Sequence, residues 1–305
     1  MFPFELTILG CSSATPTSSR HPTAQLLNMN ERFFLIDCGE ATQIQLRKFK
    51  IKIQRIDRIF ISHLHGDHYL GLPGLLGTMH LLGREKELHI YSPPGLEEII
   101  TISHHHSKTY LKYNIVFHSI EERSAVRLFE DDKLTVETIP MNHRIPCYGF
   151  LFCEKKRPKK IIQEKIEEYN IPLQEIPLIK NGQDFISQEG KRIPNAELTT
   201  EAPSPRSYAY CSDTIYNESY VQQIKNVNLL YHEATFTSDM SERAKDTHHC
   251  TAHEAGSIAL KANVNQLIIG HYSARYRELE PLLAEAKQVF SNTLLAIEGE
   301  AYKII

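Results

Sequence analysis

The chain of 305 residues lacks tryptophan and has only six cysteines, none of which forms a Cys-x-x-Cys pair. Their scattered spacing excludes a disulfide framework and favours a reducing compartment. Long hydrophobic runs are also missing, since no window approaches the roughly 18 to 20 apolar residues of a membrane-spanning helix. Residues 1–10 lack the basic start of a signal peptide. We therefore expect a soluble, cytoplasmic protein without a membrane partner.

Neither sign of charge is in excess, since 34 basic and 37 acidic residues give a formal net charge of −3. With 41% hydrophobic residues, this balance excludes a disordered chain and leaves no global basic field. Any nucleic-acid surface must therefore be local. What the sequence has in abundance is histidine, with sixteen residues. Histidine is the side chain of metal sites and of proton transfer near neutral pH.

Short β-branched or aliphatic runs alternate with helical patterns, which predicts an α/β fold whose sheets are covered by helices. Strands are expected at residues 4–9, 32–36, 58–62, 88–91, 134–140, 208–211, 228–231 and 266–269. Helices are expected at residues 40–49, 94–103, 251–262 and 278–290. Thr251 and Glu254 have the spacing of a capping box at the start of the third of these helices.

One stretch, from about residue 154 to 206, breaks this alternation and is interpreted as an insertion into a single domain of residues 1–305. Near its start the basic residues are Lys155, Lys156, Arg157, Lys159, Lys160 and Lys165. With only Glu164 among them, the local charge is +5. The basic run is either a solvated surface helix or a contact surface for a polyanion, because lysine and arginine contacts to phosphate supply most sequence-independent nucleic-acid affinity.

Four candidate metal ligands lie within six residues, at the end of the expected strand 58–62. They are His63, His65, Asp67 and His68. Side chains alternate in an extended segment, so His63 and His65 can point the same way, and Gly66 allows a turn toward a second position nearby. A single histidine at a strand end is more often structural, but four ligand-type residues at this spacing predict a site for two metal ions.

Three further ligand-type residues lie just beyond the ends of expected strands: His143, Asp213 and His271. Because sites in α/β sheets gather beyond the carboxyl ends of the strands, we expect all seven side chains to converge. Imidazole and carboxylate ligands without thiolate favour Zn²⁺, with Mn²⁺ or iron as alternatives. Two Zn²⁺ ions against two carboxylates and one hydroxide leave about +1, which suits a phosphodiester but does not exclude a carbonyl substrate.

The string His63-Leu64-His65-Gly66-Asp67-His68 resembles the metal-binding motif of the metallo-β-lactamase superfamily. Four other blocks are similar to those of the ribonuclease Z family of tRNA 3′-processing endonucleases. They read Asp-Cys-Gly-Glu-Ala-Thr-Gln at 37–43, Gly-Leu-Pro-Gly-Leu-Leu at 71–76, His-Glu-Ala-Thr-Phe at 232–236 and Ser-Ala-Arg-Tyr at 273–276. The resemblance runs from the first expected strand to about residue 276.

This resemblance implies a four-layer αβ/βα sandwich with an inserted flexible arm and two zinc ions per subunit. One ion would be held by His63, His65 and His143 and the other by Asp67, His68 and His271, with Asp213 between them. Asp67 would also orient the attacking water and accept its proton. His249 would protonate the leaving 3′ oxygen and would be oriented by Glu233, with the adjacent His248 as the alternative for that role.

The activity implied by the resemblance is hydrolysis of precursor tRNA after the discriminator nucleotide, which removes the 3′ trailer and leaves a 3′-hydroxyl on the tRNA. Family members are homodimers whose arm contacts tRNA, a role that would fall to Lys155, Lys156, Arg157, Lys159 and Lys160. Arg275 would contact a phosphate, or else pair with a surface carboxylate.

The sequence departs from the family in three places. The Gly-Pro element that is usual in the family's arm is not clear around residues 173–178. Residues 16–21 keep only the proline and the arginine of the usual Pro-x-Lys-x-Arg-Asn, and the triple histidine at 104–106 has no counterpart. The alternatives are another phosphodiesterase or 3′ exoribonuclease of this fold, a lactam or thioester hydrolase, and a non-catalytic RNA-binding protein with structural zinc. Seven ligands for two ions leave room for water, which favours catalysis.

Overall fold

The computed structural model describes residues 2–305, which divide into two compact units. The larger unit contains the chain up to Phe129 together with Val136–Phe152 and Ser207–Ile305, and the smaller unit contains Glu130–Thr135 and Cys153–Arg206. Within residues 2–305, no helix combines the length and the apolar content needed to cross a membrane.

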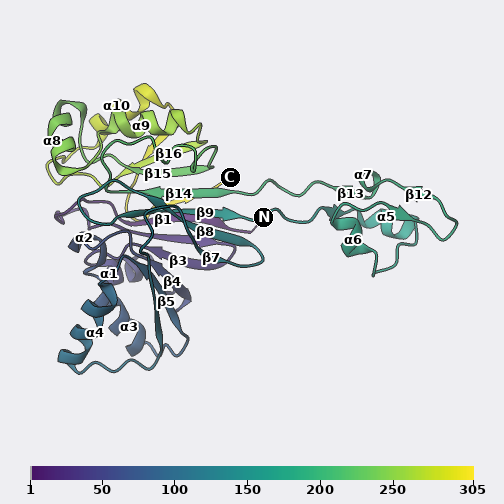
Figure 1. The fold of residues 1–305 in the computed structure, drawn as a ribbon, viewed down its shortest axis with the longest axis horizontal. Helices are drawn as coiled ribbons and strands as arrows, with labels where there is room; N and C mark the ends of the chain where they lie inside the picture. The colour runs from purple at the N-terminus through teal and green to yellow at the C-terminus, as the bar shows by residue number, and fades with distance from the viewer. Residues whose placement is uncertain (1) are drawn as a thin grey trace. The chain divides into compact units, whose positions relative to one another are not determined.

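Two seven-stranded sheets carry the fold (Figure 1). The first has the order β18 (Ala301–Lys303), β1 (Phe4–Gly10), β2 (Ala24–Met29), β3 (Arg32–Ile36), β4 (Ile56–Phe60), β5 (Leu88–Ser92) and β6 (Ile115–Ser119). The second has the order β17 (Thr293–Leu295), β16 (Gln266–Gly270), β15 (Leu229–Glu233), β14 (Ser207–Cys211), β9 (Tyr148–Glu154), β8 (Leu134–Pro140) and β7 (Arg127–Glu130). The strands from β3 to β6 and from β14 to β17 pair in parallel. Parallel strands covered on both faces are almost continuously apolar, and all five residues of β15 are buried.

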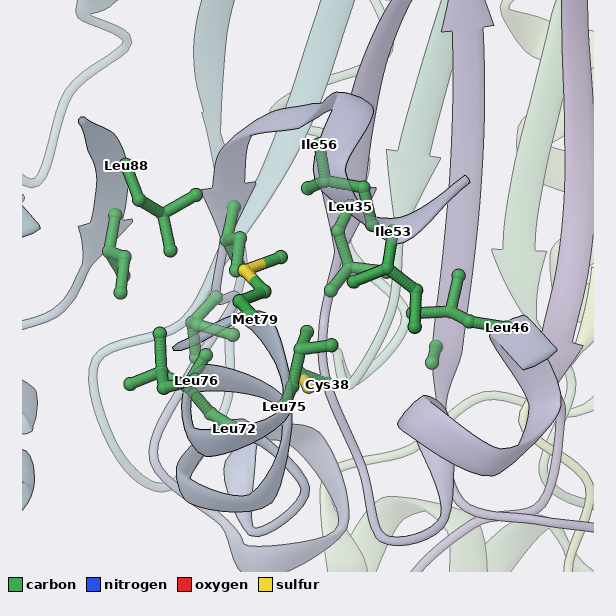
Figure 2. Packing of buried hydrophobic residues seen from close by; sticks show 14 of the residues in the cluster. Leu35, Cys38, Leu46, Ile53, Ile56, Leu72, Leu75, Leu76, Met79 and Leu88 are labelled. Atoms are coloured by element: carbon green, nitrogen blue, oxygen red, sulfur yellow. The ribbon is translucent and has the colours of Figure 1, made fainter. Parts of the chain in front are cut away.

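Helices cover the outer face of each sheet, so the larger unit is a four-layer αβ/βα sandwich (Figure 1). The helices on the side of the first sheet are α1 (Thr42–Lys48), α2 (Gly66–Tyr69), α3 (Leu72–Leu81) and α4 (Leu96–Ser107), and those on the side of the second are α8 (Ser241–Thr247), α9 (Ala252–Lys261) and α10 (Glu280–Val289). Leu75 and Met79 of α3 pack in one cluster with Leu35 and Ile56 of the sheet (Figure 2). The cluster is apolar throughout, and this burial holds α3 against the first sheet.

An aromatic layer fills the space between the two sheets. The ring of Phe60 lies 5.3 Å from that of Phe150, and the ring of Phe34 lies 5.7 Å from that of Phe152, measured between centroids. All four side chains are at most 1% exposed, and burial of each stabilises the fold by roughly 1.5–3 kcal/mol. This layer fixes the two sheets, and therefore their strand ends, against each other.

The predicted fold class is confirmed, and each predicted strand lies within two residues of an observed one. The predicted capping box is also present: the Glu254 N–H donates to the Thr251 hydroxyl, and the Thr251 N–H donates to the Glu254 carboxylate. Six strands of the two sheets were not predicted: β2, β6, β7, β9, β17 and β18. Helix α4 continues four residues beyond the predicted end and includes His104–His106, which are surface residues of its last turn.

The inserted segment has more regular structure than its sequence pattern indicated. Its elements are β10 (Lys160–Ile161), α5 (Gln163–Glu168), α6 (Ile176–Lys180), β11 (Phe185–Ile186), β12 (Arg192–Ile193), α7 (Asn195–Leu198) and β13 (Thr199–Thr200). Five buried apolar residues form a core of its own: Ile171, Ile179, Phe185, Ile193 and Leu198. The buried Asn195 side chain donates to the carbonyls of Ile179 and Gln183 and so ties this core together.

Gly71 allows the junction of α2 and α3 to lie directly against the loop after β3. A Cβ atom at Gly71 would lie 2.0 Å from the Gly39 carbonyl oxygen, so no other residue fits there. The Gly71 N–H donates to the Cys38 carbonyl at 2.9 Å, and the Cys38 N–H donates to the His68 carbonyl at 2.7 Å. These contacts fix His68 relative to the end of β3.

Candidate metal centre

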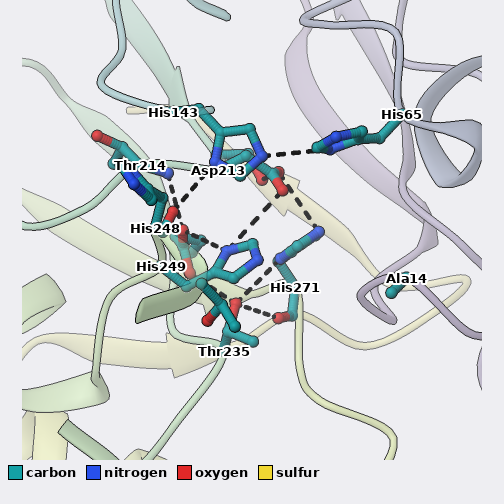
Figure 3. Close-up of polar contacts among 12 residues, drawn as sticks. Ala14, His65, His143, Asp213, Thr214, Thr235, His248, His249 and His271 are labelled. Atoms are coloured by element: carbon teal, nitrogen blue, oxygen red, sulfur yellow. Dashed lines mark hydrogen bonds and ion pairs between the residues drawn. The ribbon is translucent and has the colours of Figure 1, made fainter. Parts of the chain in front are cut away.

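The structure brings all seven predicted ligand residues together at one end of the two sheets. His63 and His65 follow β4, Asp67 and His68 lie in α2, and the remaining three residues follow β8, β14 and β16. Those three are His143, Asp213 and His271. Figure 3 shows the side chains of these last three and of His65 directed toward one another. The convergence predicted from strand ends is therefore present.

Three histidines form the first cluster. The His63 Nε2 and His65 Nδ1 atoms lie 3.0 Å apart, and the His143 Nε2 and His65 Nδ1 atoms lie 3.2 Å apart. Burial holds the pKa of His63 well below its ordinary value, and burial lowers the pKa of His143 to about 4. Burial also lowers the pKa of His65. The three imidazoles are therefore neutral at pH 7, and their nitrogen lone pairs are available to one cation.

The second cluster joins two imidazoles and two carboxylates. The His68 Nε2 atom lies 3.2 Å from Asp213 Oδ2 and 3.3 Å from Asp67 Oδ2. The His271 Nε2 atom lies 3.4 Å and 3.5 Å from the same two oxygens. Burial alone would raise the pKa of Asp67, but the neighbouring His68 and His271 imidazoles lower it below the usual range. Asp213 is likewise ionised, because His271, His68 and His63 outweigh the effect of its burial on the pKa.

The residues present fit divalent metal ions. Although the His68 and His271 Nε2 atoms lie close to both carboxylates, neither atom makes a well-aligned hydrogen bond, and both are buried. Buried polar atoms without a hydrogen-bond partner are costly, and a cation between nitrogens and carboxylates removes that cost. Asp213 lies within reach of ligand atoms of both clusters, since it groups with His63 and His68 and also with His271.

Asp37 orients one of these imidazoles, a role that the sequence reasoning missed. Its buried carboxylate accepts a hydrogen bond from His68 Nδ1 at 2.7 Å, from Tyr210 Oη at 2.5 Å and from the Ser62 hydroxyl at 2.9 Å. Because Nδ1–H donates to Asp37, the His68 Nε2 atom points into the cluster. Burial alone would lower the pKa of His68, but the Asp213, Asp67 and Asp37 carboxylates raise it well above its ordinary value, so a bound metal ion would displace a proton from Nε2. Asp37 directly follows the predicted strand 32–36, so its place at a strand end was the available signal.

His249 and Glu233 form a buried pair beside the two clusters. The His249 Nδ1 and Glu233 Oε1 atoms lie 2.9 Å apart. Burial alone would lower the pKa of His249, but the Glu233 carboxylate raises it to about 9, so the imidazole is cationic at neutral pH. Glu233 also accepts from the backbone N–H groups of Thr214 and Cys250. The neighbouring His248 instead presents its carbonyl oxygen to His143 Nδ1 at 3.1 Å.

A cavity of about 460 Å³ opens onto the centre and is lined by His65, Asp67, His143, His249 and His271, among others. Ala14 also lines this cavity, and its backbone N–H donates to Asp67 Oδ2 at 2.7 Å. Sequence reasoning missed this contact because a backbone donor has no residue signature. The cavity leaves space for an anionic group next to the ligand residues.

The predicted substrate-binding residues lie elsewhere. Arg275 is exposed, its guanidinium packs 5.1 Å from the Phe236 ring, and its Nε donates to the Ser273 hydroxyl. It forms no ion pair with any carboxylate of residues 2–305. The five basic residues of the insertion belong to the smaller unit. Three of them are in ion pairs: Lys155 with Glu130, Arg157 with Glu154, and Lys159 with Glu201. The positive charge of this run is therefore smaller than its sequence suggests.

The comparisons with known proteins agree with this geometry. The family described as "Anti-Pycsar protein Apyc1" matches residues 4–162. Ribonuclease Z of Bacteroides fragilis strain YCH46 is 51% identical over 97% of this chain and 97% of its own. Ribonuclease Z of Porphyromonas gingivalis strain W83 is 45% identical over 98% of each chain. The chain belongs to the ribonuclease Z family. Its residues 4–162 also belong to the Apyc1 family.

Solved structures agree with membership of the ribonuclease Z family. The short form of human tRNase Z is 26% identical, with a TM-score of 0.72 over 99% of each chain. The metallo-beta-lactamase fold protein YhfI from Bacillus subtilis is 19% identical, with a TM-score of 0.70 over 99% of this chain and 100% of its own, and shares the fold. The sandwich is therefore that of a ribonuclease Z with the metallo-β-lactamase fold.

Proposed function

We propose that this chain is the endoribonuclease that removes the 3′ trailer from precursor tRNA by hydrolysis after the discriminator nucleotide, leaving a 3′-hydroxyl on the tRNA. The observation that carries the proposal is the seven-residue ligand cluster beside the His249–Glu233 pair, in a chain about half identical to ribonuclease Z relatives. The cationic His249 beside the ligand cluster favours an anionic phosphodiester over a neutral lactam or thioester.

The donor set suits two Zn²⁺ ions per subunit. His63, His65 and His143 would hold one ion and Asp67, His68 and His271 the other, with Asp213 between them, because nitrogen and carboxylate oxygen without thiolate suit zinc. When bound, such ions supply Lewis-acid activation of water and neutralisation of phosphate charge. Asp37 keeps the His68 Nε2 atom free for this purpose by accepting the Nδ1 proton.

Two protein groups handle protons. The Asp67 Oδ2 atom is held by the Ala14 N–H, so the carboxylate is fixed while it orients the attacking water and accepts its proton. His249 lies on the wall of the same cavity and carries a proton, which it would donate to the leaving 3′ oxygen. Glu233 orients the His249 ring and stabilises its cationic form.

The test is to incubate the purified protein with an end-labelled precursor tRNA and each of Zn²⁺, Mn²⁺ and Fe²⁺, and then to map the cut to the nucleotide. We expect one cut after the discriminator nucleotide and a 3′-hydroxyl on the tRNA product. A ladder of products shortened from the 3′ end would identify an exonuclease instead, and binding without any cleavage would identify a non-catalytic RNA-binding protein.

We infer that the protein forms a homodimer through a surface made by α3, the neighbouring α1 and the residue after α2. Leu81 of α3 is 83% exposed, Ile44 of α1 is 59% exposed and Leu70, directly after α2, is 50% exposed. Gly74 and Gly77 lie between Leu70 and Leu81 at helical spacing, and a Cβ at Gly77 would meet no atom within 4 Å. Large exposed apolar patches mark association sites. Sedimentation analysis should therefore give a dimer for the wild type and a monomer for Leu81→Asp.

The smaller unit is proposed as the arm that binds tRNA, and the cytoplasm as the compartment. Lys156 and Lys160 support the first proposal, because they are the two basic residues of the predicted run that have no ion-pair partner within residues 2–305. Arg275 is proposed as a phosphate contact, since its exposed guanidinium pairs with no carboxylate in the same range. All six cysteines are free, which supports a reducing compartment.

A further inference from the structure

A second cavity adjoins the one at the metal centre. It has a volume of about 780 Å³ and shares two lining residues, His143 and Arg144, with the cavity of the metal centre. Cavities of about 300–1,000 Å³ are the size that encloses small organic ligands. The proposed mechanism uses only the metal-centre cavity, so the second cavity has no role yet.

Part of the lining of the second cavity is apolar and aromatic. It includes Tyr148, Ile145, Pro146 and Pro94. Tyr148 is 4% exposed, and its hydroxyl donates to the Ile120 carbonyl at 3.1 Å, so its polar end is satisfied by the protein. A planar ligand can therefore pack on this wall without leaving a buried hydroxyl unpaired. Flat apolar walls of this kind suit a nucleobase, because every base has a π-face.

The rim of the second cavity carries positive charge. Arg123 and Arg144 line the cavity, and Glu121 is the one acidic residue that lines it. The Arg144 guanidinium donates to the Asp246 carbonyl, which leaves its other N–H groups for a ligand. Arginine binds phosphate through parallel hydrogen bonds. A ligand with a planar base and a phosphate therefore matches both parts of the cavity.

We propose that the second cavity binds the nucleotide next to the scissile phosphate, with its base on the wall formed by Tyr148 and Ile145 and its phosphate at Arg123 and Arg144. This inference rests on the proposed ribonuclease activity. His143 and Arg144 line both cavities, so an RNA strand with one phosphate at the metal centre can place the next nucleotide in the second cavity. The bound nucleotide is either the discriminator nucleotide or the first nucleotide of the trailer.

The test combines altered substrates with a variant that fills the cavity. Wild-type protein and Ile145→Trp are assayed on intact precursor tRNA, on precursor with an abasic discriminator position and on precursor with an abasic first trailer position. For the wild type, kcat/KM should fall roughly tenfold on one abasic substrate, the order of magnitude of one lost stacking contact. Ile145→Trp should lose a similar factor on intact precursor and nothing further on that same abasic substrate. The affected position identifies which nucleotide is bound.

Charge reversal tests the phosphate contact. Arg123→Glu should raise KM for intact precursor roughly tenfold without changing kcat. The control is Lys225→Glu, which makes the same change in net charge at an exposed residue outside both cavities and should leave KM unchanged. Equal increases in KM for Arg123→Glu and Lys225→Glu would overturn the inference. It would also be overturned if Ile145→Trp lowered kcat/KM on both abasic substrates by the same factor as on intact precursor. Wild-type cleavage of intact precursor reports separately on the proposed function, and unchanged metal content with an unchanged melting temperature confirms that Ile145→Trp is folded.

Discussion

Substitution of Asp37 by asparagine tests how the metal centre is supported. Asp37 contacts no substrate, yet its Oδ2 atom lies 2.7 Å from His68 Nδ1 and also accepts from Tyr210 and Ser62. Asparagine keeps the shape of the side chain but removes its negative charge. The carboxylate no longer polarises the imidazole, so His68 Nε2 becomes a weaker metal ligand while the fold is retained.

The expected loss can be estimated from the contacts. Removing a carboxylate that orients a metal-bound histidine typically lowers metal affinity by about 10-fold to 100-fold, or about 1.4–2.7 kcal/mol. Asp37 is completely buried and holds three side chains at once, so the upper half of that range applies. Tyr210→Phe removes one donor to the same oxygen and leaves the charge in place, so its loss should be below tenfold.

The assay is a competition titration of the metal-free protein with Zn²⁺ and a chromophoric chelator at pH 7, which resolves the weaker of two binding steps. Asp37→Asn should weaken one step and leave the other near the wild-type value, because the cluster of His63, His65 and His143 does not contact Asp37. Wild-type affinity at both steps would refute the assigned role of Asp37. Equal weakening at both steps would instead indicate a general change in the fold.

Three further predictions follow from the same contacts. Asp67→Ala should lower kcat on precursor tRNA by several orders of magnitude, because it removes a ligand and the proton acceptor together; near-normal cleavage would rule out that mechanism. In metal-free protein, NMR titration should give His249 a pKa of about 9 in the wild type and a value nearer 6.5 in Glu233→Gln. Because the pKa of His249 is raised in the folded protein, the stability that its charged imidazole contributes is complete below about pH 6.5 and is lost as the pH rises through about 9. A difference in the free energy of unfolding between wild type and Glu233→Gln that does not change with pH would contradict this. Lys156→Ala and Lys160→Ala should each weaken precursor binding and reduce the salt dependence of log Kd by about one, whereas alanine at the ion-paired lysines of the same run should have smaller effects.

The sequence predicted the convergence of the seven side chains because its signal is local or tied to strand ends. His63 to His68 lie in one short string, and His143, Asp213 and His271 each follow a recognisable strand. Parallel strands end at one edge, so the chain order of the strands was not needed to predict convergence. The eight predicted strands were recognisable for a related reason, since each is a short apolar run bounded by turn residues.

Contacts between distant segments could not be predicted in the same way. Ala14 donates to Asp67, and Tyr210 donates to Asp37, across 53 and 173 residues. The ion pairs of the basic run were out of reach for the same reason, since Lys155 pairs with Glu130 on a different strand. Strand β2, with the sequence AQLLNM, contains no β-branched residue and so lacks the usual strand signal.

The backbone at the metal centre has a conformational cost that metal binding can offset. Asp37, Asp213 and His271 have φ angles of 55°, 54° and 59°, in the left-handed region. This conformation is unfavourable by roughly 1–2 kcal/mol for most non-glycine residues, although Asp and His adopt it more readily than others. Each residue lies one or two positions beyond a strand, where a left-handed turn keeps its side chain at the strand end. A cation that binds the folded chain and not the unfolded chain stabilises the folded state, so bound metal offsets part of the cost of the geometry that holds it.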